Sequence, residues 1–213
     1  MSWKNELRVK YSYKKVLFER VGEMNDLIGW LILLCAIVII EFYDFRLVPA
    51  LLGFQGVLFL FQFAHEGIGI EVLPLAIFSI LFVPITLYYI TVKTKIIEEK
   101  PLIPNLQSIG LLIVLIAIAY GVLYLLNIED IQLLLILVGV YGLLIKTDLR
   151  KSAASLSILI NAAHLFMESF NVIVDFALMT LSAILILLLL YFANQIYLIK
   201  GSLSTRDLKD LRF

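Results

Sequence analysis

The chain has 213 residues, of which 62% are hydrophobic, more than the roughly half that is typical of soluble domains. It carries 17 basic and 17 acidic residues, so its net charge gives no reason to expect a nucleic acid or an acidic ligand. The single cysteine, Cys35, excludes an internal disulfide, and its apolar surroundings predict an inert buried thiol.

Residues 1–26 form a basic tail that contains aromatic residues and has no signal-peptide cleavage pattern. Its basic residues are Lys4, Arg8, Lys10, Lys14, Lys15 and Arg20. Two interpretations stay open. The tail is either an amphipathic segment that lies along a membrane surface or docks on a partner, or it is a frayed terminus.

Long apolar segments separated by short charged breaks follow the tail, a pattern typical of a polytopic membrane protein. They cover residues 27–42, 47–64, 70–91, 106–126, 131–145, 149–167 and 172–199. The sequence therefore predicts an all-α fold with about seven transmembrane helices, which together form one domain over residues 27–199. A charged tail over residues 200–213 closes the chain.

The second segment carries Gln55 and Gln62, which are seven residues apart and therefore share one helix face. His65 and Glu66 follow at its end. These two are either helix-end residues that meet lipid headgroups or the mouth of a proton path.

In the third segment, Pro84 removes a backbone hydrogen bond and predicts a kink. The nearby hydroxyls of Ser79 and Thr86 are expected to satisfy backbone groups that the proline frees. In the fifth segment, Gly139 and Gly142 are expected to allow close contact between helices.

The sixth segment carries the most informative pattern, because Ser157, Asn161, His164 and Glu168 step by four, three and four residues and share one helix face. Such a polar stripe is costly in a membrane unless it faces protein, water or a moving ion. His164 and Glu168 are positioned to share a proton, and Asp175 just beyond the link would extend a relay. The alternative is a satisfied polar interface that locks this helix against a neighbour.

The lysine and arginine residues of the breaks all lie on one predicted side. The breaks at 43–47, 92–105 and 146–151 and the C-terminal tail contain them, whereas those at 65–70, 127–130 and 168–171 contain none. The positive-inside rule therefore places the C-terminus in the cytoplasm and the N-terminus outside. The basic residues of the N-terminal tail then lie on the outer side, against this rule.

The sequence contains no phosphate-binding glycine loop, no cluster of metal ligands and no pairing of a nucleophile with a base. His65 and His164 lie in different segments, which is a weak signal for a shared metal site. We therefore expect a protein that is not itself an enzyme and that holds neither a metal nor another cofactor.

Two adjacent stretches resemble a known unit. Residues 142–151 read GLLIKTDLRK and residues 158–165 read ILINAAHL. Together they resemble a two-helix unit in the K subunit of complex I, the C subunit of Mrp-type antiporters and the hydrogenase-4 component E family. Asp175 opens the next helix, as an aspartate does in the last two groups.

Two further stretches resemble component E alone. Residues 201–211, GSLSTRDLKDL, are similar to its short tail, and the third segment, with Val83-Pro84 followed by Thr86 and Tyr88, is similar to its counterpart. The chain length and the seven segments agree with that family and exclude the three-span complex I subunit.

The resemblance implies a membrane-arm subunit of a group 4, energy-converting nickel–iron hydrogenase or a related complex I-like respiratory assembly, in a prokaryotic cell membrane. Residues 146–199 would be the unit similar to subunit K. The subunit would hold no cofactor and would line or brace a proton or sodium path beside antiporter-like subunits. The alternative is a self-contained small transporter of ions or solutes, against which the lack of an internal repeat counts.

The match to these families includes Asn161, His164 and Asp175, but two ionisable positions differ. Ile160 stands where the complex I and component E families have a glutamate, and Ser79 stands where component E has a lysine. The resemblance therefore leaves open whether this subunit conducts ions or only seals and braces the path. His164 and Glu168 would either replace the missing glutamate or act as structural polar contacts.

Overall fold

The computed structural model describes residues 26–42, 44–65, 77–94, 103–128, 131–166, 172–201 and 203–204. Nearly all of the predicted N-terminal tail and most of the C-terminal tail therefore lie outside the described residues. The described part is helical, and its only β-type pairing is an isolated antiparallel bridge between Asp148 and Ser204. The predicted all-α class is confirmed.

Each predicted apolar segment contains a helix within the described residues, and residues 70–76 of the third segment lie outside them. The first helix covers residues 26–41 and is followed by α2 (Val48–His65). A π-helical turn, η2 (Phe78–Phe82), continues directly into α4 (Val83–Thr94). The later helices are α5 (Asn105–Leu125), α6 (Ile131–Ile145), α7 (Leu149–Phe166) and α8 (Val172–Lys200).

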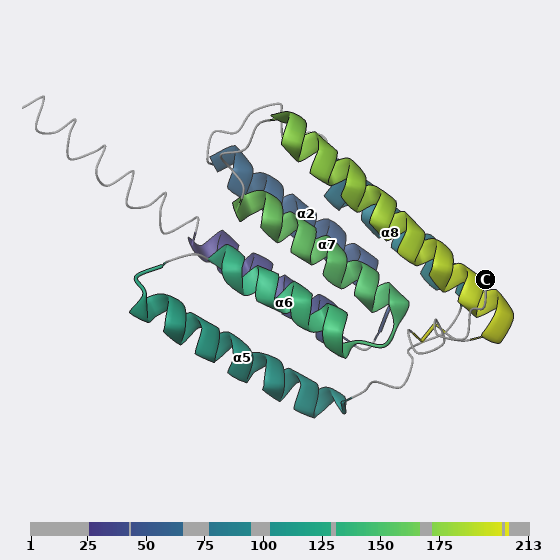
Figure 1. The fold of residues 1–213 in the computed structure, drawn as a ribbon, viewed down its shortest axis with the longest axis horizontal. Helices are drawn as coiled ribbons and strands as arrows, with labels where there is room; N and C mark the ends of the chain where they lie inside the picture. Colours follow the sequence, from purple (N-terminus) through teal and green to yellow (C-terminus); the bar gives the residue numbers. More distant parts are fainter. Residues whose placement is uncertain are drawn as a thin grey trace, which may run out of the picture.

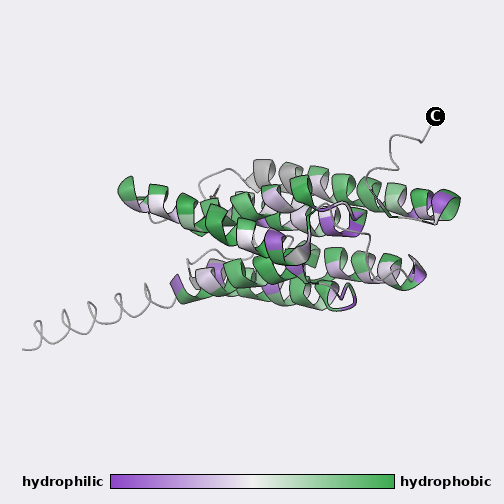
Figure 2. Cartoon of the chain, turned by 90° about the horizontal axis from the view of Figure 1, so that it is seen from below, coloured by the Kyte–Doolittle hydropathy of each residue, from purple (hydrophilic) through white to green (hydrophobic). Residues whose placement is uncertain are grey.

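The helices run roughly along a common direction, as Figure 1 shows. The closest packing joins α6 to α7, and α7 also packs against α8, whereas α5 lies at the edge of the bundle against α6. Hydrophobic residues make up most of the helices, with hydrophilic residues interspersed among them (Figure 2). Two stretches, Leu106–Leu125 and Thr180–Lys200, are long and apolar enough to cross a membrane.

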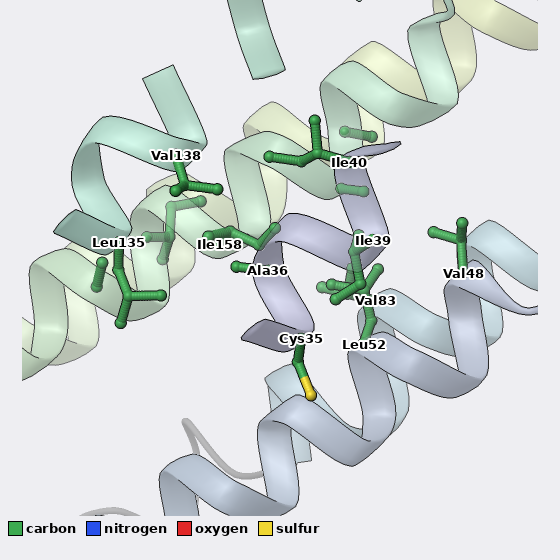
Figure 3. Close-up of a cluster of buried hydrophobic side chains, with 14 of the residues drawn as sticks. Cys35, Ala36, Ile39, Ile40, Val48, Leu52, Val83, Leu135, Val138 and Ile158 are labelled. Carbon is green, nitrogen blue, oxygen red and sulfur yellow. The ribbon is translucent and has the colours of Figure 1, made fainter. Parts of the chain in front are cut away.

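The main core lies where the 26–41 helix meets α2, α4, α6 and α7. Figure 3 labels ten of its side chains: Cys35, Ala36, Ile39, Ile40, Val48, Leu52, Val83, Leu135, Val138 and Ile158. Cys35 is a buried free thiol in this cluster, as the sequence predicted. The first helix is therefore integrated into the bundle through aliphatic packing.

The close approach of α6 to α7 depends on the two predicted glycines. A Cβ atom on Gly139 would lie 3.0 Å from the Cβ of Leu159, and one on Gly142 would overlap the hydroxyl of Ser155. No larger side chain fits at either position without displacing α7. The expectation that these glycines allow close helix contact is confirmed.

The proline break in the third segment takes the form of a π-helical turn. The N–H of Val83 donates to the carbonyl of Phe78, five residues earlier, immediately before Pro84. The Thr86 hydroxyl donates to the Phe82 carbonyl at 2.7 Å. The carbonyl that loses its α-helical partner at Pro84 is that of residue 80, so this bond is not the predicted one. The prediction for Ser79 is wrong, because its hydroxyl donates to a side chain on another helix instead of to a freed backbone group.

A glycine inside the α6–α7 contact and a glycine with open space around it allow a matched test of this packing. Gly142→Ala should lower the free energy of unfolding by about 1–3 kcal/mol, because the added methyl group overfills the α6–α7 contact. Gly121→Ala on α5 is the control, since its Cβ would meet nothing within 4 Å. Alanine favours helix by about 1 kcal/mol over glycine, so the control should be unchanged or slightly more stable. Unfolding in mixed micelles measures both, and equal losses would contradict the packing argument.

Candidate functional site

The predicted polar stripe of α7 meets the π-helical turn in the interior of the bundle. The Ser79 hydroxyl donates to Oδ1 of Asn161 at 2.7 Å, and both residues are at least 96% buried. The two residues are 82 positions apart in sequence. Ser157, one turn before Asn161 on the same face, is also buried. This part of the stripe therefore faces protein. Burying these polar groups in an apolar environment would otherwise cost free energy.

His164 lies one turn beyond Asn161 and is half-buried. Its Nδ1 lies 2.8 Å from the carbonyl oxygen of Ile160, four residues earlier on α7. Since a carbonyl only accepts, Nδ1 carries a proton and donates it to this bond. The Nε2 atom is buried and has no hydrogen-bond partner among the described residues. The bond to Ile160 therefore holds the His164 ring against its own helix, and it leaves Nε2 without a hydrogen-bond partner among the described residues.

The other residues predicted for an ion path are not placed by the structure. Glu66 and Glu168 lie outside the described residues. The backbones of His65 and Asp175 belong to α2 and α8, but their side chains are not described. Proton sharing between His164 and Glu168 stays a prediction, as does the path mouth at His65.

The two glutamines of α2 are buried on one helix face, as their spacing predicted. Gln55 Nε2 donates to the carbonyl of Ile32 on the 26–41 helix at 3.2 Å. The Oε1 atoms of Gln55 and Gln62 are buried without a hydrogen-bond partner among the described residues. These side chains add polar groups to the bundle interior on the side of the first helix.

The sequence analysis missed a buried charged cluster at one end of the bundle. It counted Lys146, Arg150 and Lys151 only as the positive charge of a break and made no prediction about their surroundings. Their exposed fractions are 4%, 0% and 1%. Buried cations need acidic or polar partners, and two acidic residues in the same region pair with Lys146 and Arg150.

The first buried pair joins helices that are distant in sequence. Lys146 Nζ donates to Oε2 of Glu41 at 2.7 Å and to the Ser108 hydroxyl at 3.0 Å. The Ser108 hydroxyl in turn donates to Oε1 of Glu41 at 2.8 Å. Tyr141 donates its hydroxyl proton to the Ser108 carbonyl at 2.9 Å. The network ties the end of the 26–41 helix, the first turn of α5, and α6 to the link before α7.

The second buried pair is local and caps α7. Asp148 Oδ1 accepts from the backbone N–H of Arg150 at 2.8 Å, the geometry of a helix N-cap. The guanidinium of Arg150 binds both carboxylate oxygens, at 3.1 and 2.7 Å. It also lies 4.1 Å from the ring centroid of Phe45 and 3.5 Å from the Thr94 hydroxyl. An aspartate just before an apolar helix is a readable N-cap signal, so this contact was open to prediction.

The chemistry of the site is that of a polar framework inside an apolar bundle. A neutral Ser–Asn pair lies in the interior, and two ion pairs lie at one end. Within the described ranges, no three His, Cys, Asp or Glu side chains come together in a way that would hold a metal ion. The described groups can fix helix positions and exchange protons locally.

Comparisons with protein-family models, with curated proteins and with solved structures found no match for this chain.

Removal of one partner of the first buried pair should be far more damaging than removal of both charges. Lys146→Met leaves the Glu41 carboxylate buried without its cation and should cost about 3–5 kcal/mol of unfolding free energy. Adding Glu41→Gln should recover most of this loss, because the remaining groups are then neutral.

A double-mutant cycle in mixed micelles measures the coupling between the two residues. Lys93→Met is the control, since Lys93 is exposed and its Nζ lies 5.9 Å from the ring centroid of Tyr89. Its loss should change stability by no more than about 0.5 kcal/mol. Additive effects of the Lys146 and Glu41 changes would refute the buried pair.

Proposed function

We propose that this chain is a non-catalytic, multi-pass subunit in the membrane arm of an energy-converting nickel–iron hydrogenase or a related complex I-like assembly. In this proposal it braces a proton or sodium path beside antiporter-like subunits in a prokaryotic cell membrane. The proposal rests on the resemblance of residues 142–165 and 201–211 to component E and on the arrangement of polar groups inside the bundle.

The distribution of apolar surface supports the membrane location. Large apolar and aromatic side chains are exposed along α4, α5 and α8, including Ile85, Tyr88, Ile118, Leu125 and Leu188. Extended exposed apolar surfaces of this kind are rare on soluble monomers and typical of surfaces that face lipid or partner helices. Beyond the two long helices, three shorter ones, over Val48–Gln62, Phe78–Thr94 and Ile131–Ile145, are also apolar.

The meeting of helix ends supports the proposed topology. The Glu41–Lys146 bond, the Arg150–Thr94 bond and the bridge from Asp148 to Ser204 bring together chain segments near residues 41, 94, 146 and 204. These are the ends that the lysine and arginine distribution assigned to the cytoplasmic side. An arrangement in which alternate helix ends meet on one side is what a multi-pass topology requires.

The observation that carries the bracing role is the bond between Ser79 and Asn161. The family resemblance places ionisable groups at positions 79 and 160, and the bond brings residue 79 against residue 161. Here those positions hold a serine and a buried isoleucine, Ile160. A neutral hydrogen bond thus occupies position 79, where the resemblance would place a lysine, and it reaches the residue next to Ile160. It holds α7 against η2 without offering a titratable group.

Affinity purification tests the proposed assembly. The chain should carry a C-terminal tag and be extracted in mild detergent, and the co-purifying proteins should be identified by mass spectrometry. We expect antiporter-like membrane subunits together with iron–sulfur and nickel-containing proteins. A chain that migrates alone or only with itself would refute the proposal and favour a self-contained transporter.

Substitution of His164 tests whether the subunit only braces the ion path or also conducts protons within that assembly. His164→Ala should leave the number of protons pumped per electron unchanged, because the side chain hydrogen-bonds its own helix. The measurement is proton uptake by vesicles that contain the assembled complex, normalised to electron flow. Blue-native electrophoresis controls for assembly. Lost pumping in an intact complex would show that His164 belongs to a conducting path.

A further inference from the structure

The chain reverses direction after α8 and returns to the start of α7. Gly201 adopts a left-handed conformation with φ of 67° and donates its N–H to the Tyr197 carbonyl at 2.8 Å. A glycine in this conformation just after a helix is a common way to end it, because it has no Cβ to clash. The turn directs residues 203 and 204 back across the end of the bundle.

The returning segment packs against the start of α7 and the end of α8. Leu203 is fully buried and packs with Leu149, Ala193 and Ile196 in an apolar cluster separate from the main core. The N–H of Leu149 donates to the Leu203 carbonyl at 3.0 Å. The adjacent bridge pairs Asp148 with Ser204.

This attachment point coincides with the buried ion pair that caps α7. Asp148, which pairs with the returning segment through its backbone, holds Arg150 through its side chain. Both side chains are at least 98% buried. The returning segment packs in a small cluster outside the main core, and such a segment opens at a lower free energy than a packed core does. Its departure would remove the contacts over Asp148 and Leu149.

We propose that Gly201, Leu203 and Ser204 form a latch that closes this end of the bundle over the Asp148–Arg150 pair. The latch opens locally and admits water to that pair while the main core stays folded. Opening and closing of the latch sets whether the buried charges at the α7 terminus are hydrated. This device follows from the contacts of the described residues and does not depend on the proposed function.

Cysteine accessibility tests the latch. The reporter is Ser152→Cys in a Cys35→Ala background, because Ser152 is buried beside Asp148 and bonds its carbonyl. Its reaction with a water-soluble maleimide should be timed in detergent micelles for four chains. These are the full chain, a chain that ends at Lys200, a chain that ends at Ser204, and the full chain with Leu203→Ala.

Loss of the latch should raise the labelling rate about tenfold or more in the chain that ends at Lys200 and in Leu203→Ala, equivalent to an opening free energy lower by about 1.4 kcal/mol. The chain that ends at Ser204 should react as slowly as the full chain. Parallel samples that keep only the native Cys35, which lies in the main core, report global unfolding.

Three results would overturn the proposal. The reporter rate could stay unchanged when the latch is lost, which would mean that the segment shields nothing. Cys35 could become reactive in parallel with the reporter, which would make the segment part of the cooperative core. Removal of residues 205–213 alone could raise the rate, which would place the closure outside Gly201, Leu203 and Ser204.

Discussion

The architecture of this bundle depends on the rule that a charge removed from water must be paired. The Glu41–Lys146 pair joins residues 105 positions apart, and an uncompensated charge at either site would carry a desolvation penalty of several kcal/mol. Satisfying both groups forces the end of the 26–41 helix, the link before α7 and the first turn of α5 to meet. The aliphatic core then packs between helices whose relative positions are restrained at this end of the bundle.

Helix α5 shows most clearly what this constraint achieves. Only 11% of its apolar stretch is buried, so packing alone gives it few contacts that would set its position. Ser108 ties one end of the helix to Glu41 and Lys146. At the other end, Tyr120 makes an edge-on ring contact with Trp30, with centroids 5.7 Å apart. These two end contacts, together with the packing of the buried Leu112 against the core, position a helix whose surface mostly faces outward.

Hydropathy predicted the positions of the helices, because helices that pack in an apolar bundle need long apolar runs. The two glycines of the fifth segment predicted the α6–α7 contact, because only glycine permits so close an approach of the two helices. The burial of Lys146 could not be predicted in the same way. Its partner is 105 residues away, and a lysine at the end of an apolar run has the same sequence pattern whether water or Glu41 surrounds it. Pro84 predicted a break in the helix but not its π-helical form, so the orientation of Ser79 toward Asn161 was also hidden.

The placement of charge along the bundle bears on what the chain can do. Asn161 lies twelve residues into α7, about 18 Å from its start at 1.5 Å per residue, and its bond to Ser79 is neutral. Among the described residues, the two buried ion pairs lie at the end where α7 begins. Charge becomes more costly with depth in an apolar medium, so a bundle that needs only rigidity concentrates its ion pairs at an end and uses neutral hydrogen bonds inside. A conducting bundle would instead need titratable groups near the depth of Asn161, and His164, one helical turn further along α7, is a candidate among the described side chains. The placement of the described ion pairs at one end supports the proposed bracing role.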